Sequence, residues 1–402
     1  MTRACIIGVS GFGDAHYEML LKEHAEGNVD IVGATIINQD EEALKCSHLR
    51  SLGCRIFEDC DAMFRELAGV ADLCLIPTGT PLHMPMTVAA LEAGMHVLVE
   101  KPAAGCIQDV RTMQKASSAA GKLVALGYQY MYEPLALETK RSILDKAIGN
   151  VEAIKCRVMW PRDHAYYSRN NWAGQLRVGD TWVLDSPFNN AVAHDLMMML
   201  FLAGAEERQA ARPISVKAEL YRANDIASAD TACIQIVTDT GVPLLFYATH
   251  ACSELLNPEI HVRGSRGNIL WTHDDVTIES DVGVKQKQTS KNMLALREHM
   301  MRAVCDVAQG GSSFYCDLET AAQQTIVVNA VHEACEVIRV SGQSLHGDDG
   351  SVRTVIPGIE AVLNRAFETD ALFYESGVPW ARPAGSLDCS NYRAFGKESP
   401  GG

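Results

Sequence analysis

A lysine that follows a glutamate at the end of an apolar run is the residue pair that most clearly could do chemistry. Glu100 and Lys101 come directly after the apolar residues 97–99 and precede Pro102. Such a run predicts a buried strand of a parallel sheet, and proline ends it because proline has no N–H to donate. Ligands bind at the carboxyl edge of such sheets. Lys101 could position a hydroxyl there or give a proton to a carbonyl; the alternative is an ion pair at a strand end.

A glycine-rich turn near the N-terminus could hold a phosphate group. Gly8 and Gly13 occupy the first and third positions of the GxGxxG pattern, Ser10 occupies the second, and Gly11 follows it. Glycines are needed there because the backbone must turn tightly and approach a pyrophosphate at a helix N-terminus. The pattern predicts a dinucleotide site, and the alternative is a simple turn between a strand and a helix.

In such a fold, the residue that usually hydrogen-bonds the cofactor ribose follows the second strand. Here a second apolar run, residues 31–37, ends at Asn38. An acidic residue at this place favours NAD, and a nearby arginine favours NADP. Asn38 matches neither rule. We expect NAD, with NADP as the alternative.

The spacing of apolar runs predicts how these residues are positioned. Strands and helices alternate over residues 1–127, which predicts an α/β fold with a doubly wound parallel sheet. Residues 128–382 contain many strands, including two joined by a hairpin at 239–241, and predict a second α/β domain with a largely antiparallel open sheet. Helices expected at 292–307 and 319–340 would pack on that sheet. Residues 383–402 read as a polar tail.

Composition excludes several classes of function. The 402 residues carry a formal net charge of -15, which does not suit nucleic acid as a partner. No run of eighteen apolar residues occurs, so we expect no membrane span. The 13 cysteines form no CxxC pair, so we expect no metal site and reduced thiols in a cytoplasmic protein.

A second group of candidate residues lies near position 190. Ser186 and Pro187 predict the N-cap and first residue of a helix that runs to residue 202. Asn190 and His194 would then lie one turn apart on one face. A histidine titrates near neutrality, which suits a general base, and the alternative is a core histidine bonded to a carbonyl.

The polar stretch 160–183 separates the two groups of candidate residues. It contains Tyr167, Arg169, Asn171 and Trp172, which are candidate substrate contacts. Linkers are typically rich in glycine, serine and proline, so this composition favours a substrate-facing segment.

Taken together, these features resemble the Gfo/Idh/MocA oxidoreductases. Four stretches carry the resemblance: residues 8–13 with His16 behind them, residues 78–83 leading into 89–97, the Glu-Lys-Pro at 100–102, and residues 262–267. The resemblance implies an N-terminal Rossmann domain and a C-terminal domain whose open sheet often makes a dimer interface. It also implies a nicotinamide cofactor, sugar- or polyol-like substrates and a homodimer or homotetramer.

The resemblance also implies roles for individual residues. The residues it places at the cofactor are Gly8, Ser10, Gly11, Phe12, Gly13, Asn38, Pro77, Thr78, Gly79, His83, Glu100, Lys101 and Gln129. For proton transfer and orientation of the substrate it implies Lys101, His194, Asp185 and Asn190. Direct register with the family's Asp-x-Gly-x-His segment instead puts Asn189 at the histidine position, so His194 and Asn189 both stay open, with Asn189 as a substrate contact.

Three functions are consistent with these residues. The first is an oxidoreductase that transfers hydride between the nicotinamide and a hydroxyl of a sugar, cyclitol or glycoside. The second is redox-neutral glycoside cleavage through a transient ketone. The third is a regulator that binds the cofactor and catalyses no reaction. The presence of the candidate catalytic residues Glu100, Lys101 and His194 argues against it.

Overall fold

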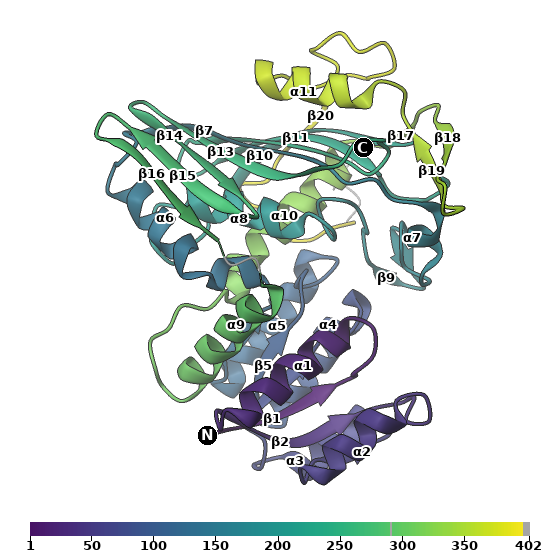
Figure 1. The fold of residues 1–402 in the computed structure, drawn as a ribbon, viewed down its shortest axis with the longest axis vertical. Coiled ribbons are helices and arrows are strands. Elements are labelled where there is room, and N and C mark those ends of the chain that lie inside the picture. Colours follow the sequence, from purple (N-terminus) through teal and green to yellow (C-terminus); the bar gives the residue numbers. More distant parts are fainter. Residues whose placement is uncertain (290–291, 397–402) are drawn as a thin grey trace. The chain divides into compact units, whose positions relative to one another are not determined.

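The protein, described here by a computed structural model over residues 1–289 and 292–396, consists of two compact units (Figure 1). The first unit contains residues 1–104, 108–133 and 292–321. The second contains residues 105–107, 134–289 and 322–396.

The first unit is built on a parallel sheet. Over the described residues this sheet has six strands in the order β3-β2-β1-β4-β5-β6. The strands are β1 (Thr2–Ile7), β2 (Val29–Thr35), β3 (Arg55–Phe57), β4 (Leu73–Ile76), β5 (His96–Val99) and β6 (Val124–Leu126). The order reverses between β1 and β4, which is where such sheets bind ligands beyond the carboxyl ends of the strands. All four residues of β4 are buried, as expected for a strand covered on both faces.

Helices connect these strands, in agreement with the predicted βα alternation. They are α1 (Phe12–Ala25), α2 (Ala43–Ser51), α3 (Cys60–Leu67), α4 (Thr80–Glu92) and α5 (Ile107–Ala120), followed by the 3₁₀ helix η1 (Gln129–Tyr132). The Asp59 carboxylate caps α3 by accepting the Ala62 N–H at 2.7 Å, which satisfies one of the donors at the helix start.

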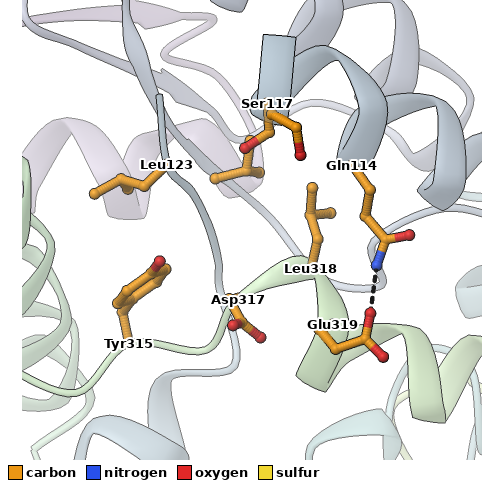
Figure 2. Close-up of a pocket in the computed structure, with 9 residues that line it drawn as sticks. Gln114, Ser117, Leu123, Tyr315, Asp317, Leu318 and Glu319 are labelled. Carbon is orange, nitrogen blue, oxygen red and sulfur yellow. Dashed lines mark hydrogen bonds between the residues drawn. The ribbon is translucent and has the colours of Figure 1, made fainter. Parts of the chain in front are cut away.

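A polar cavity of about 310 Å³ lies beside the first residues of β6 (Figure 2). Leu123 and Val124 line it at the amino end of this strand, together with Gln114 and Glu319, whose side chains are 2.9 Å apart. In a parallel sheet all carboxyl ends share one edge, so this cavity lies at the edge opposite to the ligand-binding one.

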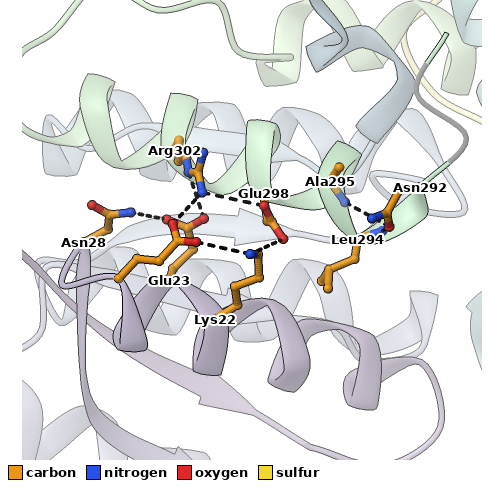
Figure 3. A network of polar contacts seen from close by, with 9 residues as sticks. Lys22, Glu23, Asn28, Asn292, Leu294, Ala295, Glu298 and Arg302 are labelled. Atoms are coloured by element: carbon orange, nitrogen blue, oxygen red, sulfur yellow. Dashed lines mark hydrogen bonds and ion pairs between the residues drawn. The ribbon is translucent and has the colours of Figure 1, made fainter.

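Helix α9 (Met293–Ala308) belongs to the first unit, which corrects the expectation that it packs on the second sheet. Figure 3 shows the contacts that hold it against α1. The Arg302 guanidinium donates to Glu23 at 2.9 Å and to Glu26 at 2.6 Å, and Lys22 pairs with Glu298 at 3.6 Å. The Glu23 side chain is 1% exposed, whereas that of Arg302 is 45% exposed, so only the carboxylate of this pair is buried. The sequence pattern predicted the helix but did not indicate that it packs against α1.

The second unit is built on a larger sheet. Over the described residues it has ten strands, in the order β16-β15-β14-β13-β7-β12-β11-β10-β17, with β20 also paired to β10. They are β7 (Val151–Met159), β10 (Pro213–Arg222), β11 (Thr231–Thr238), β12 (Pro243–Thr249), β13 (Leu256–Gly264), β14 (Gly267–Thr272), β15 (Asp275–Ser280), β16 (Gly283–Gln288), β17 (Val337–Arg339) and β20 (Gly385–Asp388). The pairs β12–β7 and β10–β17 are parallel and the others antiparallel. The predicted fold class is therefore confirmed, and part of the predicted polar tail is strand β20.

Helices cover both faces of this sheet. Figure 1 shows α11 (Ile359–Thr369) on one face and α6 (Pro134–Leu144), α8 (Ala193–Ala203) and α10 (Leu318–Ala334) on the other. Strand β12 is consequently buried along almost its whole length, and Leu245 and Tyr247 pack with Leu363 and Phe367 of α11. Smaller elements complete the unit: α7 (His164–Ser168), the hairpin β8 (Arg177–Val178) with β9 (Thr181–Trp182), and the hairpin β18 (Gln343–His346) with β19 (Val352–Val355).

Candidate active site

The glycine-rich turn joins β1 to α1 in the way the motif predicts. Gly8 and Gly11 have positive φ angles of 85° and 58°, which side chains rarely allow. A Cβ atom on Gly13 would lie 2.7 Å from the Gly8 carbonyl oxygen and 3.7 Å from the Pro77 ring, so this position admits only glycine. The turn therefore brings backbone close to the segment after β4. The Gly13 and Asp14 N–H groups donate within it, to the carbonyls of Ser10 at 2.9 Å and Gly11 at 3.3 Å.

His83 ties together the segments that follow β4 and β5. It is buried in the first turn of α4, with Nδ1 2.8 Å from the Pro102 carbonyl and Nε2 3.0 Å from the Thr78 carbonyl. Burial lowers the pKa of His83, and the two carbonyl oxygens oppose that shift. His83 thus lies between the loops that follow β4 and β5, and its single N–H in the neutral form can donate to one of the two carbonyls.

Glu100 is buried against a histidine and a glycine. His16 Nε2 lies 2.8 Å from Glu100 Oε1, and the Lys101 backbone N–H donates to Oε2 at 3.0 Å. A Cβ on Gly127 would lie 2.5 Å from Glu100 Oε1, so the carboxylate rests against bare backbone. Burial raises the pKa of Glu100, but the His16 hydrogen bond and the nearby positive charges hold it below its usual value. The position of Lys101 is therefore set by a buried, ionised carboxylate.

All predicted cofactor residues lie in the first unit, in the segments that follow β1, β2, β4, β5 and β6. Within the described part of the chain, Thr78 Oγ1 and Gln129 Oε1 are buried without a hydrogen-bond partner. Buried polar atoms of this kind are usually satisfied by a ligand or water. Together with the glycine-rich turn after β1, these atoms fit a dinucleotide.

The helix that carries His194 begins later than predicted. The first residue of α8 is Ala193, and residues 186–192 form turns. Ser186 does not cap a helix because its hydroxyl donates to the Leu184 carbonyl at 3.2 Å. His194 is thus a buried residue of the first helical turn, whereas Asn190 lies before the helix.

Asp185, which is buried, and Asn190, which is half-buried, form a hydrogen-bonded pair in the second unit. The Asp185 carboxylate accepts the Gly174 N–H at 2.6 Å and the Asn190 amide at 2.8 Å. A carboxylate held by two donors is fixed in place. Asp185 can therefore fix the orientation of Asn190.

Asn189 is held by backbone groups. Its amide donates to the carbonyls of Val183 at 2.9 Å and Leu184 at 3.2 Å, and its oxygen lies 3.3 Å from the Gln324 amide. The side chain is buried. These bonds use both amide hydrogens of Asn189, and such a side chain stabilises the loop before α8.

Arginines and aromatic rings gather in the segment between β7 and β9. The guanidinium carbons of Arg162 and Arg169 lie 4.7 Å and 3.7 Å from the ring centre of Tyr166, and Arg169 lies 5.0 Å from that of Trp172. Arg169 and Asn171 are exposed, whereas the Tyr167 hydroxyl is buried and without a partner among the described residues. The segment thus presents donors and aromatic surface, as polar ligands require.

Two further residues of this cluster were not predicted, Arg162 and His250. The His250 ring centre is 6.0 Å from that of Tyr166, and its Nδ1 donates to the Trp160 carbonyl at 2.8 Å. Burial and the charge of Arg162 lower the pKa of His250 to about 3, so the ring is neutral. His250 directly follows β12, in a mixed sheet to which the strand-end rule for parallel sheets does not apply, so no sequence signal indicated it.

The described residues hold neither a grouped set of metal ligands nor a helix that could span a membrane. Among residues 1–289 and 292–396 no three His, Cys, Asp or Glu side chains are grouped as a metal site would require. In the same part of the chain no helix combines the length and apolar character of a membrane span.

Comparison with known proteins agrees with this arrangement. Residues 2–128 match the Gfo/Idh/MocA model, described as an oxidoreductase family with an NAD-binding Rossmann fold. The dTDP-3,4-didehydro-2,6-dideoxy-alpha-D-glucose 3-reductase of Streptomyces violaceoruber is 23% identical over 84% of this chain and 97% of its own. An inositol 2-dehydrogenase/D-chiro-inositol 3-dehydrogenase of Halalkalibacterium halodurans is 24% identical over 50% of this chain, and only 52% of that relative is covered.

Solved structures show the same fold. The WlbA dehydrogenase of Bordetella pertussis, determined with NADH and UDP-GlcNAcA, matches with a TM-score of 0.66 at 21% identity. The match covers 83% of this chain and 95% of that one, so the fold similarity extends beyond the parallel sheet to the second unit.

Proposed function

We propose that this chain, a Gfo/Idh/MocA oxidoreductase by its NAD-binding domain, transfers hydride between NAD(H) and a ring hydroxyl of a sugar or cyclitol. The observation that carries the proposal is Lys101, which follows the ligand-binding edge of the parallel sheet and is positioned by buried Glu100. Relatives named for dTDP-sugar reduction and inositol oxidation support this substrate class.

The first unit would hold the cofactor. The turn at 8–13 offers N–H groups to the pyrophosphate, and Thr78 and Gln129 offer buried polar atoms. Bound NAD supplies the hydride acceptor, which no side chain can provide. Lys101, whose ammonium carries three donors, would hold the reacting oxygen and give it a proton in the reductive direction.

The second unit would supply the proton acceptor. We assign this role to His194, in the first turn of α8, because both amide hydrogens of Asn189 already donate to backbone carbonyls. Asp185 would orient the substrate through Asn190.

The test begins with the purified protein. Denaturation should release a nucleotide with the mass and absorbance of NAD or NADH, and free sugars or cyclitols should produce NADH at 340 nm. Lys101→Met and His194→Asn should each lower kcat by about 10²–10⁴-fold and keep nucleotide binding. The double variant should be hardly slower than the poorer single one because the two residues act as a unit.

Three other outcomes contradict the proposal. Cleavage of an aryl glycoside without net NADH would favour the redox-neutral reaction. Nucleotide binding without turnover of any sugar would favour a regulator. If His194→Asn turns over substrate at the parental rate while Asn189→Ala is inactive, the role assigned to His194 belongs to Asn189.

A further inference from the structure

Two arginines of the second unit carry charges that no carboxylate neutralises. Among residues 1–289 and 292–396, neither Arg162 nor Arg169 forms an ion pair, whereas Arg157 of β7 pairs with Glu259 at 3.0 Å. The chain has a net charge of -15, so carboxylates are abundant. Two neighbouring guanidinium groups left unpaired in such a chain indicate a ligand with negative charge.

One aromatic ring, that of Tyr166, lies against both guanidinium groups. The guanidinium carbon of Arg162 is 4.7 Å from its centre and that of Arg169 is 3.7 Å from it. Trp160 flanks Arg162 at 5.3 Å, and Trp172 flanks Arg169 at 5.0 Å. A guanidinium that lies over rings keeps N–H groups at its edge for an acceptor. The two arginines therefore present oriented donors.

Three buried polar atoms in the residues around this ring have no hydrogen-bond partner among the described residues. They are Arg162 Nε, the Tyr167 hydroxyl oxygen and His250 Nε2. The ring centres of Tyr167 and His250 lie 5.2 Å and 6.0 Å from that of Tyr166. Because Nδ1 of the neutral His250 donates to the Trp160 carbonyl, its Nε2 is an acceptor. The cluster thus offers donors to an acid group and an acceptor to a hydroxyl.

The carboxylates around the cluster are held by backbone. Burial and the charge of Glu360 raise the pKa of the Cys252 thiol to about 12, and the charges of Arg353 and Arg162 oppose this shift, so Arg353 is a third cation nearby. The neighbouring carboxylates each accept at least one backbone N–H; they are Asp163, Asp185, Asp230 and Glu360. The guanidinium groups of Arg162 and Arg169 remain available to an anion.

We propose that the second unit recognises a sugar that carries an acid group, with Arg162 and Arg169 as ligands of the acid group and His250 as acceptor of a neighbouring hydroxyl. A carboxylate and a phosphate ester share this chemistry, since the guanidinium fork matches the oxygens of either. The inference rests on the proposed function and narrows its substrate class. Burial and the charge of Asp185 raise the pKa of Tyr166, and Arg169 and Arg162 oppose this, so Asp185 lies near the cluster. The acid group and the hydroxyl oriented through Asp185 can therefore belong to one molecule.

The experiment compares acid sugars with their neutral partners. The probes are D-glucuronate and glucose 6-phosphate against D-glucose, and D-galacturonate against D-galactose, with NADH production as the assay. In the parent, kcat/KM for an acid sugar should exceed that for its neutral partner by about 10–100-fold, as expected for charged hydrogen bonds. The uronate and phosphate arms identify which acid group is bound.

Variants of the two arginines test their roles. Arg162→Gln should reduce the ratio of kcat/KM by about 10–100-fold, mainly through KM for the acid sugar. Arg162→Lys keeps the charge without the fork, so it should recover part of the ratio and show that the site still folds. Arg169→Gln should have a smaller effect, because Arg169 is exposed and its charge is screened by solvent.

A charge removed elsewhere in the same segment is the matched control. Arg177 pairs with Asp180 at 3.8 Å, and Arg177→Gln should leave the ratio unchanged. Equal effects of Arg177→Gln and Arg162→Gln would show that only net charge matters and overturn the assignment. Calorimetry adds a readout without turnover: the parent should bind an acid sugar, and Arg162→Gln should lose this binding. Acetate or inorganic phosphate bound as tightly as the acid sugars would reveal a simple anion site and also overturn it.

The outcomes separate this inference from the proposed function. A parent that oxidises neutral sugars as efficiently as acid ones refutes the inference and leaves the oxidoreductase proposal intact. A parent that binds acid sugars through Arg162, yet releases no nucleotide on denaturation and produces no NADH, supports the inference and refutes the proposed function.

Discussion

Lys140 is a fully buried lysine whose protonation should make the stability of the second unit depend on pH. It extends from α6, and its Nζ donates to the carbonyls of Phe201 and Gly204 at the end of α8. The ammonium also lies 5.2 Å from the Phe201 ring centre. Burial lowers the pKa of Lys140 from 10.5 to about 7, and the charge of Glu206 opposes this only in part.

The magnitude follows from the two pKa values. Each pKa unit corresponds to about 1.4 kcal/mol, so the difference between the folded and unfolded chain is worth about 5 kcal/mol. The unfolded chain binds this proton more tightly than the folded one. The penalty is therefore fully present below pH 7, and stability increases as pH rises from 7 to 10.5, by about 1.4 kcal/mol per pH unit.

Urea unfolding of the parent and of Lys140→Met measures this effect. All five tryptophans, at positions 160, 172, 182, 271 and 380, lie in the second unit, so their fluorescence reports its unfolding. Between pH 7.5 and 8.5 the parent should gain about 1.4 kcal/mol relative to Lys140→Met, because subtraction cancels the other titrating groups. The exposed Lys217→Met is the matched control and should show no such change. A parent-minus-variant difference that stays constant with pH would refute the reasoning and show that the two carbonyls keep the ammonium charged.

Two further substitutions test the cofactor half of the site. Gly13→Val should abolish NADH binding in a fluorescence titration, because its side chain would clash with the Gly8 carbonyl and distort the turn that would hold the pyrophosphate; parental affinity would contradict the dinucleotide interpretation of this turn. Gly127→Ala should displace the Glu100 carboxylate, and since a misplacement of about 1 Å can cost about 10²-fold in rate, kcat should fall by that order while the melting temperature changes little. Parental kcat in Gly127→Ala would show that the position of Glu100 does not set that of Lys101.

The parallel sheet could be predicted from the sequence because its signals are local. Apolar runs such as 73–76 and 97–99 are buried on both faces, and the motif glycines adopt the conformations that the motif requires. The hairpin at 239–241 likewise joins β11 to β12, with Gly241 at a φ of 79°.

The features that were missed depend on partners distant in the chain or on competing local bonds. The start of α8 was placed too early because Ser186 bonds to a carbonyl rather than to a helix N–H. The partner of Arg302 is 279 residues away, and no local pattern encodes such a pair.

The position of α9 in the first unit has a consequence for synthesis. The ribosome must make residues 134–291, 158 residues in all, before α9 is available to α1. At about 5–20 residues per second this takes on the order of 10–30 s. During that time the nascent nucleotide-binding unit exposes the α1 surface, and Glu23 keeps its hydrogen bond from Asn28 but lacks the Arg302 guanidinium. A fragment that stops at residue 133 would remain in this state permanently.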